Sequence, residues 1–249
     1  MARIVVQIYE IQDAREAEAV IGRGVDRIGS VILAKENWKV PAIREAILTS
    51  RAARVKHSLI PLFNTVRVLF QSIDYYEPDI VHFCESLTHD VGRMTPCEAL
   101  VELQVRVKEQ FPEIEIMRTI PVGIPGSIQR TPTLEIAKRF EDVSDYFLVD
   151  TALGNAPVDG FIGITGRTGD WTVARELVGS SSLPVILAGG LSPENVYEAV
   201  MAVRPFGADS CTRTNAVDGS GRPVRFKKDL DRVKSFVQEV RRAEQDLLS

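Results

Sequence analysis

The sequence predicts a single (β/α)8 TIM barrel, an α/β fold, from three observations. Strand-like and helix-like segments alternate strictly, eight segments of each kind are found, and the length of 249 residues is close to the roughly 250 residues typical of this fold. The rival is an open doubly wound sheet, which usually has fewer strands and carries a glycine fingerprint after its first strand. Residues 9–12, the first predicted turn, read YEIQ and contain no glycine. We therefore expect the sheet to close on itself.

The predicted strands are short runs rich in β-branched and aliphatic residues, which favour extended structure. In chain order they cover residues 3–9, 27–33, 58–63, 80–84, 115–122, 146–151 and 184–188, and a last run that begins near Gly207 and ends in hydroxyl-bearing residues. Each strand is followed by a helix that crosses back over the sheet, so the strands are expected to be parallel. Their carboxyl ends then meet at one rim of the barrel.

The predicted helices are segments in which apolar residues recur at helical spacing. They cover residues 11–24, 41–54, 65–77, 95–111, 131–143, 171–179, 193–203 and 228–244. Gly24 is expected to close the first helix. Thr95 and Glu98 have the spacing of a capping box, and Ser192 followed by Pro193 is typical of a helix start.

Composition limits the classes of protein that this chain can belong to. With 45% hydrophobic residues it can bury a full core, and no linker interrupts the alternation, so we expect one domain over residues 1–249. The net charge of -4 without a basic cluster argues against a nucleic-acid partner. No apolar run approaches the roughly 20 residues of a membrane helix, and no signal segment is seen. Three cysteines without metal-ligand spacing suit a reducing, cytoplasmic location.

Residues 184–215 contain the most informative motif, PVILAGGLSPENVYEAVMAVRPFGADSCTRTN. The motif reads as a strand, a glycine corner, a helix and a second strand. Because the ends of parallel strands lie on the same side of a sheet, Gly189 and Gly190 should converge with Thr212, Arg213 and Thr214. Small residues with free backbone N–H groups at such a rim form a phosphate cradle.

The sequence resembles the phosphoribosylanthranilate isomerase family in several segments that follow in the family's order. PVILAGGLSPENVYEAV is similar to the family's seventh strand and helix, and DAREAEAVIGRGVDRIGSVI to its first helix and second strand. LFN at residues 62–64, LVD at residues 148–150 and GDW at residues 169–171 also fit. The resemblance implies an Amadori-type isomerase of tryptophan biosynthesis, which converts an aminoaldose sugar phosphate into an aminoketose. It implies a phosphorylated small-molecule substrate and no cofactor.

This reaction needs one group that donates a proton and another that takes one. In the family the acid is the aspartate that ends the sixth strand, which corresponds to Asp150 here. A carboxylate at the carboxyl end of a barrel strand faces the mouth where substrates bind. The alternative is that Asp150 caps the following loop through backbone N–H groups.

The position of the base departs from the family. Family members carry a cysteine followed by glycine at the end of the first strand, where a thiolate takes the proton. Here this strand contains no cysteine, and the equivalent residue is Val6, Gln7 or Tyr9, depending on where a gap is placed. Glu10 is a candidate base if burial raises its pKa, and a solvated turn residue otherwise.

Three further residues are candidates for contacts with the substrate. Cys84 ends the fourth strand and either points into the mouth or packs as a small hydrophobe. Lys35, in the loop after the second strand, is a point charge for a carboxylate where the family uses an arginine, or else a solvated residue. Arg118 lies on the fifth strand. The three histidines have no spacing typical of a metal site, so no metal is expected.

The long connection between the sixth strand and the next helix contains the run FIGITGRTG at residues 161–169. Its glycines allow backbone N–H groups to approach an anion, and Arg167 beside Gly166 would add a charge-assisted contact. The alternative is a surface lid without a binding role.

Three classes of function remain open from these residues. The first is an isomerase or related lyase acting on a sugar phosphate, with Asp150 as its acid. The second is a phosphate-binding barrel that has lost catalysis, and the third is a scaffold whose loops bind a protein partner. We expect the chain to be a monomer or a homodimer.

Overall fold

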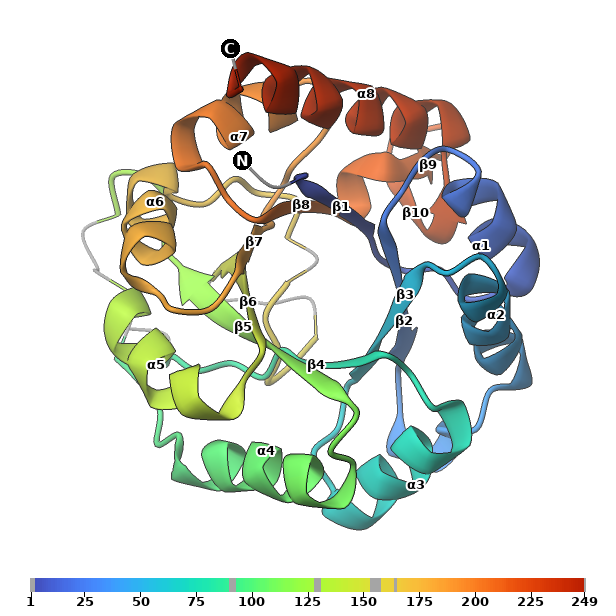
Figure 1. The fold of residues 1–249 in the computed structure, drawn as a ribbon, viewed down its shortest axis with the longest axis vertical. Coiled ribbons are helices and arrows are strands. Elements are labelled where there is room, and N and C mark those ends of the chain that lie inside the picture. Colours follow the sequence, from blue (N-terminus) through green and yellow to red (C-terminus); the bar gives the residue numbers. More distant parts are fainter. Residues whose placement is uncertain (1–2, 90–92, 128–130, 153–157, 164, 249) are drawn as a thin grey trace.

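Eight parallel strands close into a barrel, and helices surround it (Figure 1). The computed structural model describes residues 3–89, 93–127, 131–152, 158–163 and 165–248. The strands are β1 (Val5–Ile8), β2 (Arg27–Ile32), β3 (Lys56–Pro61), β4 (Ile80–Phe83), β5 (Glu115–Val122), β6 (Tyr146–Thr151), β7 (Val185–Leu187) and β8 (Gly207–Ser210). Each pairs with its neighbour in sequence, and β8 returns to β1 with Val5 opposite Gly207. The predicted barrel is confirmed.

A helix follows each strand on the outside of the barrel (Figure 1). These helices are α1 (Ala14–Ile21), α2 (Pro41–Ala52), α3 (Val66–Tyr76), α4 (Glu98–Gln110), α5 (Thr133–Phe140), α6 (Trp171–Ser180), α7 (Val196–Val203) and α8 (Leu230–Asp246). Three 3-10 turns accompany them: η1 (Lys35–Asn37), η2 (Glu141–Val143) and η3 (Thr212–Thr214). The helical pattern of the sequence therefore identified every crossover helix of the barrel.

Two predicted helix starts are wrong. Helix α4 begins at Glu98 after Cys97, so Thr95 does not form a capping box with Glu98. Helix α7 begins at Val196, because the residues before it form a separate turn in which the Ser192 N–H donates to Asn195 Oδ1 over 2.8 Å. The amide of Asn195 thus stabilises a turn that precedes the helix.

The loop between β8 and α8 carries a hairpin that the sequence did not predict as strands. It consists of β9 (Asn215–Val217) and β10 (Pro223–Lys228), which pair antiparallel. At its tip the Asp218 carboxylate accepts the backbone N–H groups of Ser220 and Arg222, over 2.8 and 3.0 Å. The hairpin lies between α8 and α1 in Figure 1, beside the end of β1.

The core has two parts, one between the strands and the helices and one inside the barrel. The larger part packs aliphatic residues of β1, β6 and β7 against α1, α6, α7 and α8. The barrel interior holds Tyr9, Met117, Leu148 and Ile186, together with the fully buried polar side chain of Gln7. The interior is therefore a filled layer, and the open space lies above it at the carboxyl ends of the strands.

A matched pair of leucines tests the packing between helices and strands. Leu177 on α6 is 1% exposed, whereas Leu48 on α2 is 46% exposed. We expect Leu177→Ala to lower the free energy of unfolding by about 2–5 kcal/mol, because it leaves a cavity in a packed core. Leu48→Ala should change it by less than about 0.5 kcal/mol. Urea unfolding followed by circular dichroism measures both values, and equal losses would contradict the packing described.

Candidate active site

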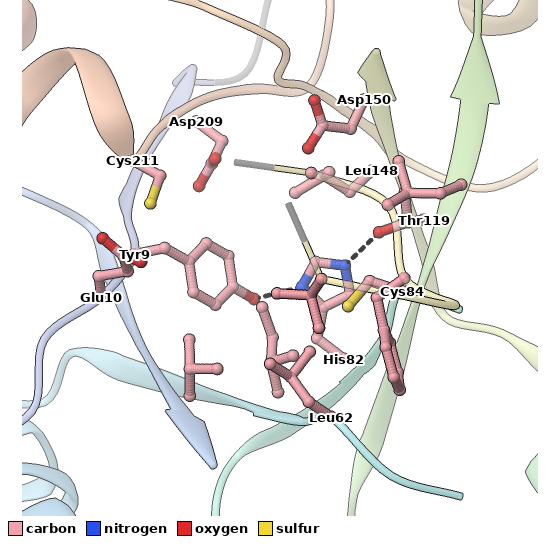
Figure 2. Close-up of a pocket in the computed structure, with 16 residues that line it drawn as sticks. Tyr9, Glu10, Leu62, His82, Cys84, Thr119, Leu148, Asp150, Asp209 and Cys211 are labelled. Carbon is pink, nitrogen blue, oxygen red and sulfur yellow. Dashed lines mark hydrogen bonds between the residues drawn. The ribbon is translucent and has the colours of Figure 1, made fainter. Parts of the chain in front are cut away.

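Two adjoining pockets open at the carboxyl ends of the strands. The mouth pocket has a volume of about 600 Å³, its opening included, and its labelled lining residues are shown in Figure 2. The glycine pocket has a volume of about 300 Å³ and lies over the ends of β7 and β8. Asp150, Asp209 and Cys211 line both pockets, so the two are parts of one site.

The glycine pocket depends on two residues that must lack a Cβ atom. Gly189 and Gly190 have φ angles of +82° and +62°, a region that favours glycine. A Cβ on Gly189 would lie 2.4 Å from Thr151 Oγ1, and one on Gly190 would lie 2.7 Å from the backbone carbon of Arg167. The two glycines therefore let the loop after β6 pass directly over the end of β7.

Most of the predicted phosphate-binding residues meet at this pocket. Gly166, Gly189, Gly190, Thr212 and Arg213 line it. The Arg213 guanidinium donates to the Gly166 carbonyl over 2.8 and 3.1 Å, which joins the loop after β8 to the loop after β6. A positive charge and a glycine-rich backbone at one concave site suit an anion.

Two predicted phosphate-binding residues are not among the residues that line the glycine pocket. The Thr214 side chain is buried, and its hydroxyl donates to the Cys211 carbonyl over 3.0 Å. Arg167 contributes its carbonyl, which accepts the Thr151 hydroxyl over 2.7 Å, while the residue itself is exposed. Both contacts hold the loops in place, and the phosphate contacts expected of Thr214 and Arg167 stay predictions.

Asp150 is the penultimate residue of β6 and lines both pockets. Figure 2 shows its carboxyl group at the mouth pocket. Burial raises the pKa of its carboxyl group to about 6, and a hydrogen bond from the Thr151 N–H, 2.7 Å long, opposes this rise. The carboxyl group thus caps one backbone N–H and also faces the pocket. A pKa near neutrality suits a group that exchanges protons.

Asp209 on β8 is a second carboxyl group that the sequence reading missed. It is buried, lines both pockets, and accepts a hydrogen bond from Gln7 Nε2 over 3.1 Å. Burial raises its pKa, and the nearby charge of Asp150 adds to the rise. A carboxylate at the carboxyl end of a barrel strand is the signal that could have identified it.

Tyr9 spans the floor of the mouth pocket (Figure 2). Its hydroxyl is hydrogen-bonded to His82 Nδ1 over 2.6 Å, and His82 Nε2 is hydrogen-bonded to Thr119 Oγ1 over 2.7 Å. Burial lowers the pKa of His82 to about 3 and raises that of Tyr9, so both groups are neutral. The ring covers Gly29 so closely that a Cβ there would lie 2.1 Å from it.

Glu10 lies at the rim of the mouth pocket with its carboxylate engaged by the hairpin. Arg225 forms an ion pair with it over 2.6 Å, and Asn215 Nδ2 donates to it over 3.2 Å. Burial acts to raise the pKa of Glu10, but the charges of Arg225 and Lys228 and these hydrogen bonds outweigh it and lower the pKa. The carboxylate therefore anchors the hairpin to the end of β1.

The three predicted substrate-contacting residues lie in different surroundings. Cys84 lines the mouth pocket as a buried thiol, since burial raises its pKa. Lys35 is exposed beside Glu36 and is not among the residues lining either pocket. Arg118 is fully buried outside the barrel wall, where it contacts Glu85. The positions of Lys35 and Arg118 correct the direct substrate contacts predicted for them.

Arg118 instead supports the loop that covers the mouth pocket. It forms an ion pair with Glu85 over 2.6 Å and donates to Gln104 Oε1 over 2.6 Å. The segment after β4 that contains Glu85 is hydrogen-bonded to the loop after β6, since the Ser86 N–H donates to the Gly160 carbonyl over 2.8 Å. Phe161, in the loop after β6, forms a β-bridge with Glu85 and lines the mouth pocket.

Comparison with known proteins identifies the family. The model for N-(5'-phosphoribosyl)anthranilate (PRA) isomerase matches residues 102–239. The PRA isomerase of Methanocella arvoryzae is 33% identical over 95% of this chain and 97% of its own length. That of Haloferax volcanii is 30% identical over 96% of this chain and 93% of its own length. The chain belongs to the PRA isomerase family.

A solved structure supports the family's fold in this chain. The phosphoribosyl anthranilate isomerase of Thermotoga maritima superposes with a TM-score of 0.67, and the match covers 96% of this chain and 98% of the other, at 21% identity. Within the family fold, the end of β1 is where the expected cysteine is absent. Glu10 has a φ angle of +65°, a conformation that favours glycine. The residue that corresponds to the family's cysteine stays a prediction, with Val6, Gln7 and Tyr9 as its candidates.

In the residues that the structure describes, no group of three His, Cys, Asp or Glu side chains could hold a metal ion. Within the same residues, none of the helices is long and apolar enough to cross a membrane.

Two glycines test the anion site. We expect Gly190→Ala to abolish measurable binding of inorganic phosphate, because a Cβ at this position collides with the backbone at residue 167 and its φ is positive. Gly179→Ala in α6 is the control, since its Cβ would meet nothing within 4 Å and alanine favours a helix. Isothermal titration calorimetry with phosphate measures both. Unchanged affinity in Gly190→Ala would contradict the proposed location of the anion.

Proposed function

We propose that this chain is a PRA isomerase, which catalyses an Amadori rearrangement in tryptophan biosynthesis. The observation that carries the proposal is the position of Asp150, which lines both the glycine pocket and the mouth pocket. A substrate with a phosphate at one end and an aromatic ring at the other would place its sugar carbons beside this carboxyl group. Membership of the PRA isomerase family supports the same reaction.

The glycine pocket suits the phosphate of such a substrate. Its wall contains the backbone of Gly189 and Gly190 and the side chain of Arg213, the combination that binds anions in barrels of this kind. Arg213 is held by the Gly166 carbonyl, which leaves its positive charge at the edge of the pocket. An anion bound there would sit directly above β7 and β8.

The mouth pocket suits an aromatic ring. Most of its wall is apolar, formed by Val31, Ile60, Leu62, Leu148, Val158, Phe161 and Ile162. Such a surface buries a planar ring, while the few polar groups at its floor orient it. The two pockets together therefore separate a charged end from an apolar end of one ligand.

In this assignment Asp150 is the general acid. As a carboxylic acid it protonates the ring oxygen of the ribose, and the bond between this oxygen and the anomeric carbon then breaks. The raised pKa allows the group to hold a proton near neutral pH, which an ordinary aspartate with a pKa near 3.9 does not do.

A direct assay tests this assignment. Wild-type protein should convert PRA, and Asp150→Asn should lower kcat by about 10²–10⁴-fold, the usual contribution of a general acid or base. Phosphate affinity should be retained or increased, since asparagine keeps the shape of the aspartate and removes a negative charge from the wall of the glycine pocket. The loss of PRA fluorescence follows the reaction, and calorimetry follows binding. A folded, phosphate-binding wild type that leaves PRA unconverted would contradict the proposed activity.

The second candidate is a phosphate-binding barrel that has lost catalysis. The absence of a cysteine from β1 and from the two residues that follow it, Tyr9 and Glu10, is the observation that favours it. This alternative predicts that sugar phosphates raise the Tm while none of them is consumed. The assay with PRA separates the two candidates.

We infer a cytoplasmic location and a monomeric or homodimeric state. The Thermotoga maritima relative is described as a dimeric phosphoribosylanthranilate isomerase from which monomers have been generated. Light scattering coupled to size exclusion determines the state of this chain.

A further inference from the structure

The proposed reaction needs a base, and the family's cysteine is absent from the end of β1. Any replacement must be an ionisable side chain that faces the reacting carbons. The ionisable side chains that line the mouth pocket are Tyr9, Glu10, His82, Cys84, Asp150, Asp209 and Cys211. Asp150 is assigned as the acid, so the base is sought among the other six.

Glu10 and His82 already have partners that occupy their functional atoms. The carboxylate of Glu10 is paired with Arg225 over 2.6 Å, which lowers its pKa and makes it a weak base. Both ring nitrogens of His82 are hydrogen-bonded, to Tyr9 and to Thr119. Burial lowers the pKa of His82 to about 3, so the imidazole resists protonation.

The two thiols and the phenol are held in their protonated forms. Burial raises the pKa of Cys84 and of Cys211, and the thiolate is the form that acts as a base. Burial also raises the pKa of Tyr9, whose hydroxyl is bound to an imidazole 2.6 Å away. None of these three groups supplies a basic form near neutral pH.

Asp209 differs from all of them in its surroundings. It is buried at the junction of the two pockets, and the hydrogen bond recorded for it among the described residues comes from the neutral amide of Gln7. In the barrel wall Asp209 lies opposite Gln7 of β1, so it is on the same side of the site as the family's base. Figure 2 shows Asp150 and Asp209 on two sides of the same space, above the ring of Tyr9.

We propose that Asp209 is the general base of this enzyme, and that a pair of carboxyl groups, Asp150 and Asp209, replaces the carboxyl and thiolate of the family. The inference rests on the proposed isomerase function. It assigns the second proton transfer to a residue on β8 in place of one on β1.

The proton transfers balance over the whole rearrangement. Asp150 gives its proton to the ring oxygen, which takes the electron pair of the broken C–O bond while the nitrogen lone pair forms an iminium. The Asp209 carboxylate then removes the proton from C2, and the electrons of this C–H bond form the C1=C2 bond of an enolamine. Asp209 returns the proton to C1, and Asp150 takes the proton of the C2 hydroxyl as the ketone forms. Both residues end in their starting states.

Two carboxyl groups in one buried site suit this cycle, because they resist ionising together. Burial raises the pKa of each, and the charge of Asp150 adds to the rise at Asp209. The hydrogen bond from Gln7 and the positive charge of Lys228 oppose the rise at Asp209 but do not cancel it. Between its two titrations the pair as a unit holds a single proton, which either member can carry. The higher pKa of Asp209 places this proton mainly on Asp209. The productive form, with the proton on Asp150 and the negative charge on Asp209, is therefore the minor of the two singly protonated forms.

The pair also determines the pH dependence. Its apparent pKa values of about 6 and about 8 in the free protein predict a bell-shaped profile of kcat/KM. Below the lower value both groups are protonated and the base is lost. Above the higher value both are ionised and the acid is lost. No other ionisable side chain of the mouth pocket is expected to titrate in this interval.

The test compares Asp209→Asn with Asp74→Asn, a control on the exposed face of α3. Asp209→Asn should lower kcat by about 10²–10⁴-fold and remove the bell shape of any residual activity. Phosphate affinity should be retained or increased, because a negative charge is removed from the wall of the glycine pocket. Asp209→Glu, which keeps the carboxyl group, should recover part of the turnover. Asp74→Asn should behave as the wild type. Full activity in Asp209→Asn would overturn the proposal.

Tyr9→Phe tests the competing assignment, in which the phenol of Tyr9 is the base. We expect this variant to keep a bell-shaped profile, because the carboxyl pair is intact. If Tyr9→Phe abolishes turnover while Asp209→Asn retains it, the phenol is the base and the proposal is overturned.

A measurement without substrate separates this inference from the proposed function. Infrared difference titration of the wild type should show a protonated carboxyl group at neutral pH, and Asp209→Asn should change its titration. If PRA is not converted but this signal is present, the substrate assignment fails and the carboxyl pair is supported. If both groups are ionised at neutral pH, the pair is overturned whatever the substrate is.

Discussion

The pairing of β1 with β8 is the constraint on which the site depends. It joins residues 5–8 to residues 207–210 across almost the whole chain and closes the barrel. A Cβ on Gly207 would lie 2.8 Å from the Val5 carbonyl, so the two strands approach this closely only because residue 207 is glycine. Closure brings Gln7 to Asp209, and it brings Glu10 to the hairpin that follows β8. The position of Asp150, the proposed acid on β6, does not depend on this pairing. The position of Asp209, the proposed base on β8, does.

The buried carboxyl groups of this chain differ in whether an arginine faces them. Glu10 and Glu85 each face an arginine over 2.6 Å, which compensates the cost of burying them. These two ion pairs hold the hairpin and the loop over the mouth pocket. Asp209 is buried without such a partner among the described residues and contacts an amide instead. A carboxyl group in this setting keeps its proton more readily, and it is therefore available for proton exchange.

The sequence was sufficient to predict the barrel and to place Gly189, Gly190 and Asp150 at the carboxyl ends of strands, because each of these depends on local pattern. Strand and helix periodicity identifies the βα units, and parallel crossovers bring Gly190 and Arg213 to one rim. Whether the side chains of Arg118 and Asp209 reach the pocket depends on the face of the strand that each occupies. On strands buried on both faces, polarity does not reveal this, so Arg118 was placed in the pocket and Asp209 was missed. The hairpin was missed because it is short and lies within a single loop.

Tyr9 occupies much of the space at the end of β1, the strand on which the family is expected to carry a cysteine. A phenol ring needs far more room than a thiol, and Gly29 on the neighbouring strand provides it. The ring then reaches His82 on β4, which is in turn bound to Thr119 on β5, so one row of hydrogen bonds crosses the floor of the pocket. Such a row is rigid and neutral, since burial suppresses the charge of both Tyr9 and His82. The end of β1 thereby becomes part of the floor of the pocket, which agrees with the proposal that carboxyl groups on β6 and β8 exchange the protons.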